Sequence, residues 1–108
     1  MTIKEFMTAL EGQDFVALSK CFTENGKLND YCPATCGKQN FHVYGSRTVE
    51  MFYRNQFFLG GLQVSHVKVE TPERASFLIS YGNQVARAVA TIAASEGGLL
   101  SEVNILPA

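Results

Sequence analysis

The chain has 108 residues and a mass of 11.9 kDa, which predicts a single domain over residues 1–108. Hydrophobic residues make up 46% of it and charged residues 18%, which is typical of a globular chain and excludes a disordered one. Nine scattered Lys and Arg stand against ten Asp and Glu, so no nucleic-acid partner is expected. No apolar run is long enough to cross a membrane, and Lys4, Glu5 and Glu11 lie where a secretory leader is apolar. We therefore expect a cytoplasmic protein without a membrane partner.

Three cysteines, an odd number, occur without an export signal, so reduced thiols are expected rather than a disulfide framework. Cys32, Cys36 and His42 follow the spacing C-x3-C-x5-H, and Cys21 is available as a fourth ligand. The second close pair typical of structural zinc is missing, so we expect no metal and keep zinc as the weaker alternative. A Cys32–Cys36 bridge under oxidising conditions stays open.

The first half of the chain predicts helices and short strands. Thr2 and Glu5 form a capping box for a helix over 2–11, and Asp14 is the expected cap of a helix over 15–22. After an Asn25-Gly26 turn, we expect a strand at 27–31, a loop at 32–40 and a strand at 41–44. Ser46 is the expected cap of a third helix, which the Gly60-Gly61 pair ends.

The second half changes from a helical period to alternation of apolar and polar residues. Strands are predicted at 62–70, 75–82, 84–94 and 99–106. Short turns join them, including the two-residue hairpin signal Gly82-Asn83, so the four strands should form an antiparallel meander. Three helices followed by strands predict an α+β domain in which the helices pack on this sheet.

Three segments carry a resemblance to a known family. They are ALEGQDFVALSKCFTENGKLND (Ala9–Asp30), GSRTVEMFYRNQF (Gly45–Phe57) and LLSEVNIL (Leu99–Leu106). In this order they resemble the nuclear transport factor 2-like superfamily, the cystatin-like α+β cone, and within it the SnoaL-like and ketosteroid-isomerase-like branch. The resemblance implies a curved sheet around a cone-shaped cavity for a small apolar ligand, with the outer sheet face available to a second subunit.

The predicted strand 84–94 has two contrasting faces. One is rich in alanine and either accommodates the third helix closely or leaves a void for a ligand: Ala86, Ala88, Ala90, Ile92 and Ala94. The other carries Val85 and Val89, and with Leu100 or Leu106 it would expose an apolar patch. This patch predicts a homodimer through the sheet.

Asp30 is the first candidate for chemistry. It shares a strand face with Leu28, so a core-facing Leu28 would bring the carboxylate to the cavity, where burial raises a carboxyl pKa toward useful values. The resemblance implies the same role, because Asp30 matches the family's general base. The alternative is that Asp30 caps the turn at Tyr31-Cys32-Pro33.

Further polar candidates are Tyr53, His42 and Tyr81. By the resemblance, Tyr53 matches a tyrosine of the network behind the oxyanion hole, whereas the isomerases' oxyanion donors and a second network tyrosine are replaced here by Phe6, Ala90 and Phe22. A substitute donor is therefore needed, and Tyr53, His42 or Tyr81 could serve. A His42–Asp30 dyad would be the sharpest arrangement for proton transfer.

Two functions follow as hypotheses, and no cofactor is implied because phosphate-binding and hydrolase motifs are missing. The first is an enzyme (isomerase, cyclase, dehydratase or hydrolase) that uses Asp30, His42 and Tyr53 on a small carbonyl compound. The second is a non-catalytic module that binds a small molecule or dimerises. The expected ligand-binding residues are Phe6, Phe22, Tyr44, Phe52, Phe57, Tyr81 and Ala90.

Overall fold

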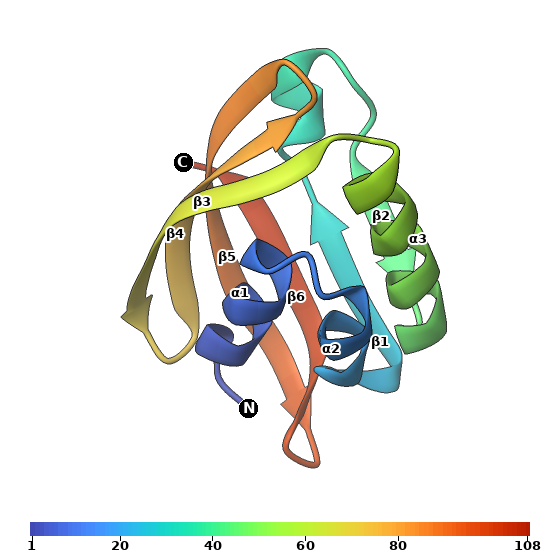
Figure 1. Cartoon of the computed structure of the whole chain (residues 1–108). Helices are drawn as coiled ribbons and strands as arrows, with labels where there is room; N and C mark the ends of the chain where they lie inside the picture. The colour runs from blue at the N-terminus through green and yellow to red at the C-terminus, as the bar shows by residue number, and fades with distance from the viewer.

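The computed structural model describes all residues from 1 to 108 as three α-helices on one face of a six-stranded sheet (Figure 1). The elements are α1 (Ile3–Glu11), α2 (Phe15–Lys20), β1 (Phe22–Asp30), the 3-10 helix η1 (Pro33–Cys36), β2 (Phe41–Tyr44), α3 (Ser46–Phe58), β3 (Leu62–Thr71), β4 (Arg74–Tyr81), β5 (Gln84–Glu96) and β6 (Leu99–Pro107). The α+β class is confirmed. No helix is long and apolar enough to cross a membrane.

The strand order is β2-β1-β6-β5-β4-β3. The predicted antiparallel meander is confirmed for β3 to β6. The sheet is nevertheless mixed, because β1 runs parallel to β6 and antiparallel to β2. The early strands thus extend the meander to six strands and bring the end of β1 beside β6.

The starts of the helices follow from short polar side chains. The capping box is confirmed, and the hydrogen bond from Thr2 lowers the pKa of Glu5 to about 2. Asp14 caps α2, because its Oδ1 accepts a hydrogen bond from the amide of Ala17 at 3.0 Å. The prediction for α3 is wrong by one residue: Gly45, at a φ of +96°, is the cap, and Ser46 is the first helical residue. This backbone conformation favours glycine over serine.

The junction of α2 and β1 differs from the prediction. The helix ends at Lys20, and the strand starts at Phe22, so Asn25-Gly26 lies inside β1, where the pairing with β6 shifts register, instead of forming a turn. A Cβ at Gly26 would lie 2.9 Å from the Phe22 side chain. Gly26 therefore allows the strand to fold closely over its own first residue.

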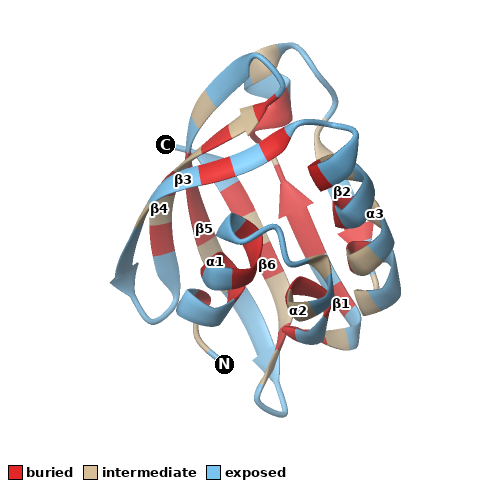
Figure 2. Cartoon of the chain, in the orientation of Figure 1, coloured by how far each residue is buried: buried red, intermediate tan, exposed pale blue.

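The core lies between the helices and the inner sheet face, where buried residues follow one side of each element (Figure 2). Ala88 and Ala90 are fully buried there. Helix α1 packs over β3, β4 and β5, so the helix above these alanines is α1 and not the third helix, as expected from the sequence. The small side chains serve close helix packing, and no void remains between them and α1.

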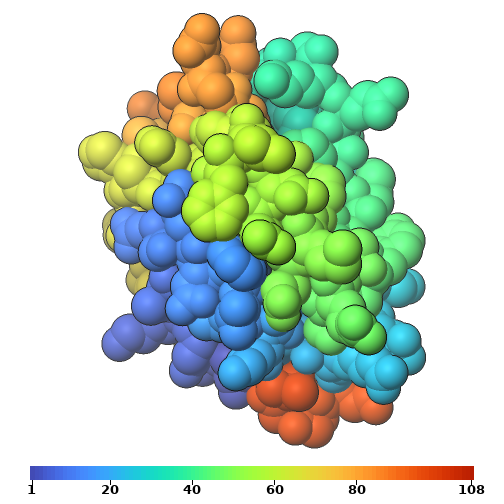
Figure 3. Space-filling view, turned by 45° about the vertical axis from the view of Figure 1, so that its right-hand side comes forward, coloured from blue at the N-terminus to red at the C-terminus, as the bar shows by residue number.

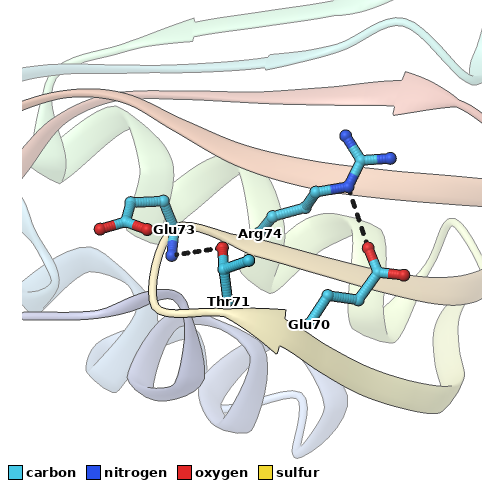
Figure 4. A network of polar contacts seen from close by, with 4 residues as sticks. All are labelled: Glu70, Thr71, Glu73 and Arg74. Atoms are coloured by element: carbon cyan, nitrogen blue, oxygen red, sulfur yellow. Dashed lines mark hydrogen bonds and ion pairs between the residues drawn. The ribbon is translucent and has the colours of Figure 1, made fainter.

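The outer sheet face exposes only some of the residues that were predicted to form an apolar patch. Val85 and Leu106 are 63% and 44% exposed, whereas Val89 is only 7% exposed between neighbouring strands and Leu100 is buried in the core. At one edge, the β3–β4 turn is held by a Glu70–Arg74 ion pair at 2.9 Å and by the amide of Glu73, which donates to Thr71 Oγ1 (Figure 4).

Candidate functional site

Asp30 is the last residue of β1, and its carboxyl group faces the inner side of the sheet. Its side chain is fully buried, as is Leu28 on the same face. The Tyr81 hydroxyl, from the end of β4, donates to Asp30 Oδ2, and the amide of Cys32 donates to Asp30 Oδ1 at 2.9 Å. The alternation of the strand therefore brings this carboxyl group into the protein interior, as predicted.

Burial dominates the electrostatics of this carboxyl group. It raises the pKa of Asp30 above the ordinary value of 3.8, although hydrogen bonds from Tyr81 and Cys32 act in the opposite direction. The carboxyl group caps the turn through the Cys32 amide, and it also has the raised pKa that burial was expected to give. A carboxyl group of this kind exchanges protons nearer to neutral pH than an exposed one.

Tyr53 adds a second hydroxyl group to the interior. It lies on α3, is fully buried, and its hydroxyl has no hydrogen-bond partner. Burial and the nearby Asp30 carboxylate raise the pKa of Tyr53, and the same two causes raise that of Tyr81. Both hydroxyls therefore stay protonated donors at neutral pH. A buried hydroxyl group without a hydrogen-bond partner is rare. It can bind a polar ligand atom or a water molecule.

Aromatic rings enclose these polar groups. The Phe41 ring lies 5.7 Å from that of Tyr81 and 4.9 Å from that of Phe52, which in turn contacts Tyr53 at 5.2 Å. Phe57 lies 5.9 Å from Tyr53 on the other side. None of the four surface hollows of the molecule is lined by any of these residues. The structure thus shows no open cone cavity at these residues. The space-filling view shows α3 packed beside the N-terminal helices on one face of the molecule (Figure 3).

His42 does not lie with Asp30. Its register partner on β1 is Asn29, and its Nδ1–H donates to Asn29 Oδ1 at 2.9 Å on the outer face of the sheet. Asn29 Nδ2 continues to Asn104 Oδ1 at 3.0 Å. Because adjacent residues of a strand point to opposite faces, His42 and Asp30 are separated by the sheet. The proposed His42–Asp30 dyad is therefore wrong.

Tyr44 also lies outside the site. It is 57% exposed on the outer face, where the Lys27 ammonium group lies 5.7 Å from its ring. Phe6 and Phe22 are buried and form an edge-to-face pair at 6.1 Å within the core. Of the predicted site residues, the structure gathers Asp30, Tyr53, Tyr81, Phe52 and Phe57 into one cluster.

The cysteines are all free thiols. Burial and the Asp30 carboxylate raise the pKa of Cys32 to about 12, and burial raises that of Cys21 to about 11. No three His, Cys, Asp or Glu side chains come together as metal ligands, so the Cys32–Cys36–His42 set is not assembled. The Cys32–Cys36 bridge stays a prediction.

One residue of the site, Phe41, was not singled out in the sequence; it is the register partner of Asp30 on β2. Cys32 was considered as a metal ligand and as part of the turn that Asp30 caps, and its amide donates to Asp30, as the turn predicts. Only the expected strand at 41–44 carried a signal for Phe41, because residues directly opposite in an antiparallel pair share a face. The register itself was not predictable from local sequence.

Comparison with known proteins finds similar folds. An NTF2-like protein of unknown function from Cytophaga hutchinsonii has a TM-score of 0.68 at 17% identity, covering 98% of this chain and 86% of that one. An uncharacterised cystatin-fold protein from Novosphingobium aromaticivorans has a TM-score of 0.70 at 13% identity, covering 96% and 93%. A protein with a ketosteroid isomerase-like fold from Catenulispora acidiphila, in complex with trimethylamine, has a TM-score of 0.65 at 10% identity, covering 96% and 82%.

No family profile and no curated protein matches the sequence. At 10 to 17% identity, the solved structures establish the fold and carry no activity with them. The chain therefore has the nuclear transport factor 2-like, cystatin-like fold that its sequence resembles, and its function has to be argued from the residues around Asp30.

Proposed function

We propose that this protein is an enzyme that transfers a proton on a small, apolar carbonyl compound, with Asp30 as general base and acid. The observation that carries the proposal is a fully buried carboxyl group with a raised pKa beside two protonated tyrosine hydroxyls. Neighbouring buried titratable groups with perturbed pKa values are typical of acid–base sites.

The chemistry needs a base and an electrophilic donor. The Asp30 carboxylate takes a proton from the carbon next to the carbonyl group. The electron pair of that C–H bond forms a carbon–carbon double bond, and the π pair of the carbonyl group moves to its oxygen, giving an enolate. Tyr81 and Tyr53 supply the hydrogen bonds that this oxygen requires. They thereby replace the isomerase donors whose positions hold Phe6 and Ala90 here. Asp30 then returns its proton to the same or another carbon.

The unpartnered hydroxyl of Tyr53 is the group that most favours a bound oxygen atom. Tyr81 already donates to Asp30, so it has to exchange this bond for one to the ligand. Tyr53 has no hydrogen bond to give up. Because its buried hydroxyl group lacks an acceptor, a ligand carbonyl oxygen would supply the missing partner. Tyr53 is therefore the first donor to the carbonyl group, and Tyr81 the second.

The test is proton exchange on simple ketones. In deuterated water, the protein should catalyse α-deuteration of cyclohexanone or β-tetralone, followed by proton NMR. Asp30→Asn should abolish the exchange, because its amide cannot accept the proton. Asp14→Asn changes an exposed helix cap and should leave the rate unchanged. Equal rates for the protein and its Asp30→Asn variant would contradict the proposal.

A second candidate, a non-catalytic binding module, has its own support. Aromatic rings around a carboxylate suit a small alkylammonium cation, and the Catenulispora acidiphila protein of the same fold is in complex with trimethylamine. The two candidates differ in how ligand binding depends on pH. A cation binds to the charged form of Asp30 and is released as pH falls, whereas a neutral carbonyl ligand does not need that charge. NMR titration with trimethylammonium chloride at two pH values separates them.

We also propose that the outer sheet face pairs with a second copy of this chain. Val85 and Leu106 are exposed on this face, and Leu78 lies partly exposed between them and β3. Arg87 lies toward one end of β5, while Glu102 pairs in register with Ala94 toward the other end, and neither is in an ion pair. An antiparallel stack of two copies brings each Arg87 to Glu102 of the second copy, which supports a twofold dimer.

A further inference from the structure

Two partly exposed rings, Phe41 and Phe52, lie between the solvent and the buried carboxyl group of Asp30. They pack edge-to-face at 4.9 Å, and Phe41 also packs against Tyr81, the direct partner of Asp30. Deeper rings such as Phe57 are more completely buried. A ligand that reaches Asp30 from this side has to displace one of these two rings.

The two rings differ in how firmly the backbone holds them. Phe41 is the first residue of a four-residue edge strand that pairs only with β1, and it follows the irregular segment 37–40. Phe52 is the central residue of the thirteen-residue helix α3, which packs on α2 and the sheet. Short edge strands open at lower free energy than packed helices, so Phe41 is the ring expected to move.

We infer that the Phe41–Phe52 ring pair is the entrance to the Asp30 site and limits the size of the molecules that enter it. This inference rests on the proposed function for the identity of the ligand. The entrance itself stands on the packing of Phe41 against Tyr81, on the packing of Phe52 against Phe41 and Tyr53, and on the partial exposure of both rings. Rotation of the Phe41 ring away from Phe52 admits a small, flat molecule and excludes a bulky one. Phe41 and Phe52 are therefore specificity-determining residues.

Cys32 offers a reporter of this entrance that needs no substrate. Its side chain is fully buried, and its amide contacts Asp30. With Cys21→Ala and Cys36→Ser in the full-length chain, Cys32 is the one remaining thiol. Its modification is followed by mass spectrometry at about pH 9 with two reagents, the small iodoacetamide and the bulky N-pyrenylmaleimide. Each rate is divided by the rate of the same reagent with the unfolded chain. This ratio corrects for the different intrinsic reactivities of the two reagents.

Phe52→Ala should raise the iodoacetamide rate at least tenfold and should raise the maleimide rate more, so that the preference for the small reagent falls. Phe58→Ala removes a 70% exposed ring from the same helix and should change neither rate. Phe57→Ala removes a buried ring of the same size away from the entrance and controls for loss of stability. Low urea should leave the rates unchanged, because a ring rotation exposes little surface.

Two outcomes would overturn the inference. Unchanged rates in Phe52→Ala mean that Cys32 is reached through the η1 segment, and equal acceleration by Phe57→Ala means that it is reached by global unfolding. Because thiol modification involves no carbonyl compound, its result is independent of the ketone exchange test. An entrance with no exchange activity would leave the inference standing and the proposed catalysis refuted.

Discussion

Replacing Asp30 by asparagine removes a buried charge and keeps a hydrogen bond with each partner, although the bond with Tyr81 reverses its direction. The amide oxygen of Asp30→Asn can accept from the Cys32 amide, and its NH2 group can donate to the oxygen of Tyr81. The pKa of Asp30 is raised in the folded state above the ordinary value of 3.8, so the folded protein binds this proton more tightly than the unfolded chain. That stabilisation is fully present below about pH 3.8 and is lost as pH rises through the folded pKa.

The magnitude follows directly from this linkage. Each unit by which the folded pKa exceeds the unfolded one costs about 1.4 kcal/mol of folding free energy at higher pH. The asparagine variant has no carboxyl group to deprotonate, so its stability does not fall for this reason. Its free energy of unfolding should therefore increase relative to that of the wild-type protein as pH rises from about 4 to about 8. For a domain of this size, 1 kcal/mol corresponds to about 4 °C in melting temperature.

The assay is thermal and urea unfolding of both proteins across this pH range. Glu5, whose pKa is lowered to about 2, is present in both and cancels in the difference. Asp30→Ala is the matched control, because it also removes the charge but leaves Tyr81 and the Cys32 amide without an acceptor, which costs about 1–3 kcal/mol near pH 4. A stability difference between wild type and Asp30→Asn that stays constant, or that falls as pH rises, would refute the reasoning.

Tyr81→Phe removes the donor to a buried carboxylate and should lower the stability at pH 7 by about 1.5–3 kcal/mol in urea; an unchanged midpoint would show that this bond contributes nothing. Tyr53→Phe removes a hydroxyl without a partner and should leave the melting temperature equal or raise it, so a clear loss would mean that the hydroxyl is bonded. His66→Gly relieves a φ of +55° and should stabilise the chain by about 1 kcal/mol in urea, and destabilisation would argue against backbone strain. Val85→Arg should convert the proposed dimer to a monomer in sedimentation at tens of micromolar without changing the isolated fold, whereas a wild-type protein that is already monomeric there would contradict the dimer.

Local patterns predicted the features that depend on neighbouring residues. Thr2 and Glu5 identified the start of α1, because a capping box lies within four residues. The alternation of Leu28 and Asp30 predicted an inward carboxyl group, and burial fits that prediction. Gly82-Asn83 predicted the β4–β5 hairpin, which the pairing of Tyr81 with Gln84 confirms.

Features that depend on distant pairing were not predictable in the same way. The parallel pairing of β1 with β6 joins segments far apart in sequence, and it turned the Asn25-Gly26 signal from a turn into an irregular position of a strand. The His42–Asp30 dyad was a hypothesis based on the chemistry of proton transfer, but the β1–β2 register pairs His42 with Asn29. Shifting such a register by one residue exchanges the two faces of a strand, so only the structure separates these alternatives.

The most direct test of the account is the titration of the Asp30 carboxyl group by carbon-13 NMR in the intact protein. The account predicts a midpoint above 3.8, because burial outweighs the hydrogen bonds from Tyr81 and Cys32, and a further rise in Tyr81→Phe. A midpoint at or below 3.8 for Asp30 would contradict the account, since the carboxyl group would then be a structural cap held in its charged form.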